Sequence, residues 1–266
     1  MRIEDQRYET IAFSRRGRVL TASLDRAAAG NAVNGPMHEE LSRLFYDLQA
    51  DDGSDVIVLA GEGRHFCAGG DIAWMQESID DPEVFLKMGQ EAKRIIFGQV
   101  EMEKPLICRL NGAAAGLGAS LALLCDVIIA GENASVGDPH VSVGLVAGDG
   151  GCIIWPQLVG YTRAKEYLFT GKMVGAVEAE RIGLINRVVP VDGLDRAVVE
   201  FADELAAGAT RAIRWTKVTV NTPLKTLVHQ LFDTGLAYET LSNLTADHQE
   251  AVNAFRERRK PVFRGQ

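Results

Sequence analysis

Two glycine-rich segments, HFCAGGDI at residues 65–72 and NGAAAGLGAS at residues 111–120, decide how this chain is expected to fold. Each follows a run of apolar residues, Val56–Ala60 before the first and Leu106–Leu110 before the second. Glycine lets a backbone approach a ligand closely, because it has no side chain. The second segment precedes an apolar helical run, so its free N–H groups are expected at a helix N-terminus, where negative charge on an oxygen is stabilised.

Either segment taken alone is also compatible with a tight turn or with close helix packing. Neither of them contains GxGxxG followed by an acidic residue, and neither contains GxxxxGK[ST]. The sequence therefore gives no support for a nucleotide-binding fold.

The surrounding sequence alternates between strand and helix patterns. Two β-rich runs at residues 8–14 and 19–24 flank a short turn and predict a hairpin. A helix is expected after Pro36, where Leu41, Leu44, Phe45 and Leu48 recur at helical spacing. Further strands are expected at 56–60, 106–110 and 126–130, with helices at 82–103 and from about 116. This rhythm predicts an α/β fold of stacked ββα turns, although no exact sequence repeat accompanies it.

The character of the sequence changes after Gly160. Helices are expected at 163–170, 176–181, 194–207 and 223–259, and a single strand at 185–189. We therefore divide the chain into a core at residues 1–194, which would carry binding and catalysis, and a helical C-terminal region at residues 195–266.

The amino-acid composition is typical of a globular protein and argues against several other classes. The 266 residues are 47% hydrophobic and 24% charged, which is enough apolar material for a large core. The formal net charge of -8 disfavours a nucleic-acid-binding surface. The N-terminus lacks the apolar stretch of a signal peptide, and the apolar runs elsewhere are too short and too polar to span a membrane. The four cysteines form no CxxC pair. We therefore expect a cytoplasmic protein with reduced thiols.

The two glycine-rich segments, followed by VGLVAGDGG at residues 143–151, together resemble the enoyl-CoA hydratase/isomerase (crotonase) family. Segments 25–34, 171–185 and 254–263 also match, so the resemblance extends over residues 8–264. It implies a crotonase-like stacked ββα superhelix with a helical C-terminal region. It also implies assembly into a homotrimer or homohexamer through that region.

The resemblance further implies an acyl-CoA substrate, with coenzyme A entering as part of that substrate and no separate cofactor. The thioester carbonyl oxygen would lie between the backbone N–H groups of Gly70 and Leu117, an arrangement that stabilises an enolate. The residues implied to contact substrate or coenzyme A are Arg26, Ala32, Ala68, Asp71, Ile72, Lys260 and Phe263. Many members carry Lys or Arg where this chain has Gly30, which weakens one expected phosphate contact.

The chain departs from the family at the two glutamates that handle water and proton in typical hydratases. Ser120 and His140 occupy those positions. Ser120 is expected to open room for substrate, and His140, oriented by Asp149, to act as the general acid or base, since an imidazole with a pKa of about 6.5 suits neutral pH. The alternative is that His140 caps a loop and Asp149 caps the following helix.

The stretch GDPHVSVGLVAGDGG at residues 137–151 resembles 6-oxocamphor hydrolase, a β-diketone C–C hydrolase of the same superfamily, which also carries a catalytic glutamate matching Glu239. Three functions follow: hydration of a 2-enoyl-CoA or a related double-bond step, hydrolytic C–C cleavage of a cyclic β-diketone or β-keto acyl-CoA, and coenzyme A binding without turnover. No metal is expected, because the remaining histidines show no ligand spacing. They are His38, His65, His229 and His248.

Overall fold

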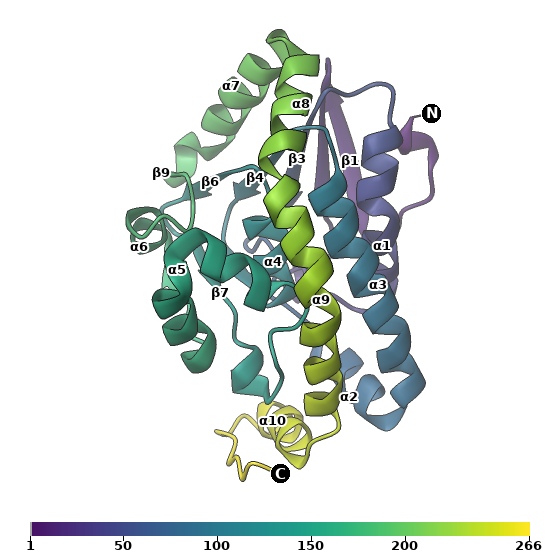
Figure 1. The fold of residues 1–266 in the computed structure, drawn as a ribbon, viewed down its shortest axis with the longest axis vertical. Helices are drawn as coiled ribbons and strands as arrows, with labels where there is room; N and C mark the ends of the chain where they lie inside the picture. Colours follow the sequence, from purple (N-terminus) through teal and green to yellow (C-terminus); the bar gives the residue numbers. More distant parts are fainter. Residues whose placement is uncertain (1) are drawn as a thin grey trace.

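The computed structural model describes residues 2–266 and contains two sheets (Figure 1). The predicted strands form the larger sheet, and the strands of the smaller sheet were not predicted. The larger sheet has the strand order β1-β2-β3-β4-β6-β9, and only the β1–β2 hairpin is antiparallel. Its strands are β1 (Ile11–Arg16), β2 (Val19–Leu24), β3 (Val56–Gly61), β4 (Leu106–Leu110), β6 (Val127–Gly131) and β9 (Arg187–Val189). The smaller sheet contains β5 (Ala113–Ala115), β7 (Ser135–Gly137) and β8 (Val174–Gly175).

Successive turns of chain give one strand to each sheet. β4 is followed at once by β5, and β6 by β7, and then a helix or a short helical turn leads onward. Cys67 makes a parallel bridge with Ala114, so the chain after β3 also reaches the edge of the small sheet. The expected α/β fold of stacked ββα turns is therefore confirmed.

Helices cover the core face of the large sheet. They are α1 (Gly35–Ala50), α2 (Ile72–Asp80), α3 (Pro82–Glu101), α4 (Leu117–Leu123), α5 (Gly151–Thr170) and α6 (Ala176–Arg181). Asn34 caps α1 by accepting a hydrogen bond from the N–H of Met37 at 3.2 Å. The predicted apolar face of α1 is buried against β2 and β3, because Leu41, Leu44 and Leu48 are completely inaccessible to solvent.

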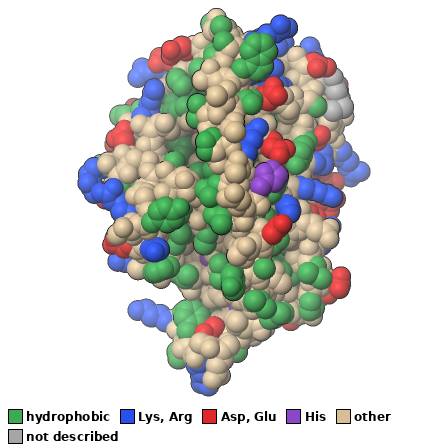
Figure 2. Space-filling model, in the orientation of Figure 1, with side chains coloured by type: hydrophobic (Ala, Val, Ile, Leu, Met, Phe, Trp, Pro, Cys, Tyr) green, Lys and Arg blue, Asp and Glu red, His purple; other side chains and the backbone are tan. Residues whose placement is uncertain are grey.

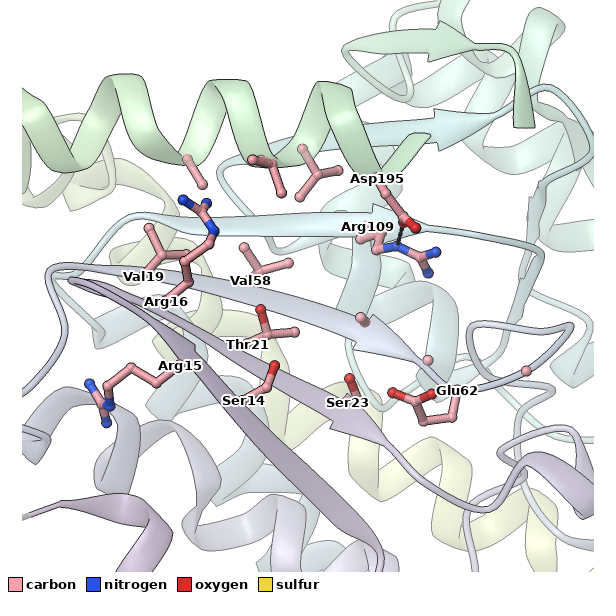
Figure 3. A pocket seen from close by; sticks show the side chains of 16 residues that line it. Ser14, Arg15, Arg16, Val19, Thr21, Ser23, Val58, Glu62, Arg109 and Asp195 are labelled. Carbon is pink, nitrogen blue, oxygen red and sulfur yellow. Dashed lines mark hydrogen bonds and ion pairs between the residues drawn. The ribbon is translucent and has the colours of Figure 1, made fainter. Parts of the chain in front are cut away.

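The opposite face of the large sheet is covered by α7 (Leu194–Ala207), which packs Leu194, Val198 and Ala202 onto β3, β4 and β6. Beside α7 a groove of about 450 Å³ remains open above β1 and β2, and Figure 3 shows Ser14, Thr21 and Ser23 on its sheet side. None of the predicted site residues lines this groove. Because α7 begins at the predicted division of the chain, the first part of the C-terminal region completes the packing of the sheet.

The C-terminal helices differ in part from the prediction. α8 (Thr210–Val220) was not predicted, and the single helix expected at 223–259 is two helices, α9 (Thr222–Asn243) and α10 (Ala246–Arg256). The helix breaks because Thr245 has extended backbone dihedrals and its side chain accepts from the N–H of His248 at 3.2 Å, which begins a new helix. In Figure 1, α9 runs along the front of the molecule and α10 lies at one end, beyond α2.

Short 3-10 helices connect some of these elements, at Ile3–Asp5, Ala27–Ala29, His140–Val143 and Val191–Gly193. Within residues 2–266, none of the helices combines the length and the apolar character that crossing a bilayer requires.

Candidate active site

The two glycine-rich segments lie directly against each other. The N–H of Cys67 donates to the carbonyl of Ala113 at 3.0 Å, and the N–H of Ala115 donates to the carbonyl of Cys67 at 2.9 Å. A Cβ at Gly118 would lie 2.6 Å from the Cβ of Cys67, closer than two carbon atoms can approach, so this contact requires glycine. The segments therefore form one rigid unit.

This unit presents two unused backbone donors to a cavity of about 70 Å³. The N–H of Asp71 donates to Val33 at 2.9 Å and that of Gly116 to Gly137 at 3.1 Å, whereas within the described residues 2–266 the N–H groups of Gly70 and Leu117 donate to no protein acceptor. Gly70 and Leu117 both line the cavity. The other lining residues are Val33, His38, Trp74, Met75, Ser78, Phe85, Met88, Gly89, Ala92, His140, Leu145, Asp149, Leu236, Glu239, Asn243 and His248.

His140 lies beside these donors, at the beginning of the 3-10 helix that follows β7. A Cβ at Gly116 would lie only 3.3 Å from Cε1 of His140, so the ring packs against the turn that carries the Leu117 amide. Nδ1 of His140 makes a short hydrogen bond to Oδ1 of Asp138, and Nε2 lies 3.5 Å from Oδ2 of Asp149. The imidazole is thus held between two carboxylates.

Asp149 was expected to orient His140, but the carboxylate bonded to Nδ1 of the ring belongs to Asp138. The signal was present in the sequence, because Asp138 stands two residues before His140 and Pro139 turns the chain between them. Asp149 does not cap α5, whose N-cap is Gly150 without a side-chain hydrogen bond. Its Oδ1 lies 3.4 Å from the hydroxyl of Ser120, which is completely buried. Ser120 therefore contacts Asp149 but does not itself line the cavity.

Glu239 enters the same cavity from α9, which lies far away in the sequence. The loop before α5 packs closely against α9, and only glycine at position 148 allows this contact. A Cβ at Gly148 would lie 2.4 Å from the carbonyl oxygen of Gly235 and 2.8 Å from Oε2 of Glu239. Glu239 is 8% exposed, and its Oε2 has no hydrogen-bond partner among the described residues. The structure thus brings His140, Asp149 and Glu239 to one cavity.

Burial and neighbouring charges shift the pKa values of these groups. Burial would lower the pKa of His140, but the negative charges of Asp138 and Asp149 outweigh it and hold this pKa well above its usual range. Burial, together with the charge of Asp149, raises the pKa of Glu239 to about 8. The protonated forms of His140 and of Glu239 are therefore both favoured in this cavity.

Asp138, His140 and Asp149 bring possible metal-ligand atoms within 4.8 Å of one another. The two carboxylates, however, lie at opposite nitrogens of one ring. An ion bound at either nitrogen would be out of reach of the carboxylate at the other, since ligand bonds are about 2.0–2.2 Å long. The arrangement fits proton transfer better than metal binding.

The residues expected to contact coenzyme A fall into two groups. Arg26 donates to the carbonyl of Ala32 and, at 3.2 Å, to the carboxylate of Asp71, so these three lie together. Ala68 and Ile72 belong to the same loop and its helix. Lys260 and Phe263 are instead exposed on the tail after α10, and neither lines the cavity.

The arrangement around His140 makes a prediction about its titration. Asp138→Asn removes the largest of the contributions that raise the pKa of His140, so this pKa should fall further than in Asp149→Asn. Histidine resonances followed by NMR across the pH range measure both. Equal pKa values in the wild type and Asp138→Asn would show that Asp138 does not govern the ring.

Glu239 makes a prediction about stability. The pKa of Glu239 is higher in the folded protein than in the unfolded chain, so the folded state binds this proton more tightly. This contribution to the free energy of unfolding is fully present below about pH 4.5 and is lost as pH rises through about 8. Glu239→Gln, which stays neutral, should therefore raise the melting temperature relative to wild type by about 5 °C or more at pH 9, and by less at pH 6. A difference independent of pH would contradict the buried, protonated acid.

Comparison with known proteins places this site in a family. The sequence profile of the enoyl-CoA hydratase/isomerase family matches residues 14–266. A crotonyl-CoA hydratase of Syntrophomonas wolfei is 34% identical over 258 residues, covering 96% of this chain and 98% of that protein. An enoyl-CoA hydratase/isomerase from Mycobacterium paratuberculosis superposes with a TM-score of 0.89 at 34% identity, covering 92% and 98% of the two chains.

A third relative differs in activity. A β-diketone hydrolase from the cyanobacterium Anabaena sp. PCC 7120, solved with (S)-3-oxocyclohexyl acetic acid, superposes with a TM-score of 0.83 at 30% identity over 89% of this chain and 95% of its own. The family profile and the two hydratase-named relatives span nearly the whole chain. The protein is accordingly an enzyme of the enoyl-CoA hydratase/isomerase family.

Proposed function

We propose that this enzyme adds water across the 2,3-double bond of an acyl-CoA thioester. The observation that carries the proposal is the presence of two free amides, those of Gly70 and Leu117, in one cavity with His140. Two converging N–H donors stabilise the negative charge that develops on a thioester oxygen when a nucleophile attacks the β-carbon. Removing one such donor typically costs about 3–4 kcal/mol of barrier.

In this mechanism, Asp149 accepts a proton from water and His140 donates a proton to the substrate. Asp149 takes a proton from water while the water oxygen bonds to the β-carbon, and the electron pair of the double bond moves onto the thioester oxygen as an enolate. Nε2 of His140 then gives its proton to the α-carbon, which restores the carbonyl. Transfer of the proton from Asp149 to His140, across the 3.5 Å between them, returns the site to its resting state.

A second candidate, hydrolysis of a carbon–carbon bond in a cyclic β-diketone or β-keto acyl-CoA, is favoured by the likeness to the β-diketone hydrolase. Water would add to the ketone, the bond to the neighbouring carbon would break, and the resulting enolate would bind the same two amides. The neutral acid Glu239, unpaired in the cavity, offers a proton for that carbanion.

Two turnover assays test these proposals. Wild-type enzyme should hydrate crotonyl-CoA, with loss of the absorbance of the conjugated double bond, and His140→Ala should lower kcat/KM by about 10²–10⁴. His229→Ala is the matched control, since His229 is 60% exposed on α9 and does not line the cavity. Cleavage of a cyclic 1,3-diketone without hydration of crotonyl-CoA would replace the first proposal by the second.

We also propose that the enzyme is a cytoplasmic homotrimer, or a homohexamer of two trimers. Figure 2 shows hydrophobic side chains over the face formed by α8 and α9, and apolar residues there and near the C-terminus are exposed, among them Trp215, Val220, Leu241, Leu244 and Phe255. In this proposed assembly, Lys260 and Phe263 on the exposed C-terminal tail would contact the coenzyme A of a neighbouring subunit, as the family resemblance implies. The four cysteines are unpaired thiols, as expected in a reducing compartment.

Sedimentation velocity measures the assembly. We expect the mass of three or six chains, and conversion to smaller species when Leu241 and Leu244 are both changed to Glu, because the charges would be buried in the interface. A wild-type protein that sediments as a monomer at micromolar concentration would contradict the assembly.

A further inference from the structure

A second buried histidine, His248, lines the same cavity as His140. It lies near the beginning of α10 and is completely inaccessible to solvent. Its Nδ1 lies 2.6 Å from the carbonyl oxygen of Val143, in the 3-10 helix that begins with His140. A carbonyl oxygen only accepts hydrogen bonds, so Nδ1 must carry a proton and donate it.

The other ring nitrogen of His248 is left without a partner. Burial lowers the pKa of His248, so the ring is neutral at physiological pH and Nε2 holds a lone pair. Among the buried side-chain atoms of residues 2–266 that lack a hydrogen-bond partner, only Nε2 of His248 and Oε2 of Glu239 belong to residues that line this cavity. Nε2 is thus a buried hydrogen-bond acceptor beside the substrate space.

The neighbouring wall does not satisfy this acceptor. Side chains of Trp74, Phe85 and Leu236 make much of the lining apolar. The polar groups of Ser78 and Asn243 bond to each other, with 3.2 Å between the hydroxyl and the amide oxygen. An acyl group that fills the cavity therefore meets a largely hydrocarbon surface with an open acceptor in it.

We propose that the acyl group of the substrate carries a hydroxyl beyond its reacting carbons, and that this hydroxyl donates a hydrogen bond to Nε2 of His248. The proposal rests on the proposed acyl-CoA function and adds a substrate class to it, ω- or side-chain-hydroxylated acyl thioesters. A ligand without the hydroxyl would leave the acceptor buried and unpaired, which weakens binding by about 10-fold or more.

Binding of unreactive ligands measures this preference directly. Isothermal titration calorimetry would compare 4-hydroxybutanoyl-, 5-hydroxypentanoyl- and 6-hydroxyhexanoyl-CoA with the unsubstituted thioester of the same chain length. We expect at least one hydroxylated thioester to bind wild-type protein about 10-fold or more tightly than its partner. His248→Phe should abolish that preference, and His248→Gln, which keeps an acceptor oxygen, should retain part of it. Thermal melts would establish that both variants fold.

The outcomes separate this proposal from the one on which it rests. Equal affinity of wild type for every matched pair would overturn it, and so would a preference that survives in His248→Phe. The corresponding free hydroxy acids and unsubstituted acids are titrated in parallel. A protein that binds no thioester would contradict the acyl-CoA function, while the free acids would still report whether His248 selects a hydroxyl.

Discussion

The site depends on the close contact between two glycine-rich segments. Glycine at position 118 lets the backbone of Cys67 approach α4, and Gly116 adopts a positive φ of 54° while lying against the ring of His140. A side chain at Gly118 would push the two segments apart, and one at Gly116 would crowd the ring of His140. Because the segments are also joined by backbone hydrogen bonds, the amides of Gly70 and Leu117 are held in place. This is the preorganisation that their proposed role in binding a thioester oxygen requires.

A second feature is the close grouping of four ionisable side chains, three of which line one cavity. Asp138 and Asp149 keep His140 protonated, and the same negative charge, added to burial, keeps Glu239 neutral. Burial and neighbouring charge therefore favour the protonated forms of both His140 and Glu239. In the proposed reactions these groups, together with Asp149, would take the roles of the two glutamates that typical hydratases use.

Sequence reasoning predicted the parts of the fold that depend on local patterns. The apolar run of β3 and the helical spacing of Leu41, Leu44 and Phe45 each had one interpretation, and the structure confirms them. It did not predict α2, α8 or the strands β5, β7 and β8, and each of these strands has at most three residues. It also missed the break before α10, which depends on one side-chain cap. Asp138 was overlooked as a site residue although it stands two residues before His140, whereas the role of His248 depends on its contact with the distant carbonyl of Val143, which no spacing reveals.

The central claim is that the amides of Gly70 and Leu117 together polarise a thioester carbonyl. Infrared difference spectroscopy of a bound acyl-CoA with a ¹³C-labelled thioester carbonyl measures that polarisation without turnover. The account predicts that the labelled C=O stretch moves to lower frequency on binding than in water, because two fixed donors withdraw charge onto the oxygen. A stretch at or above its frequency in water would show that these amides do not bind the carbonyl, and would contradict the account.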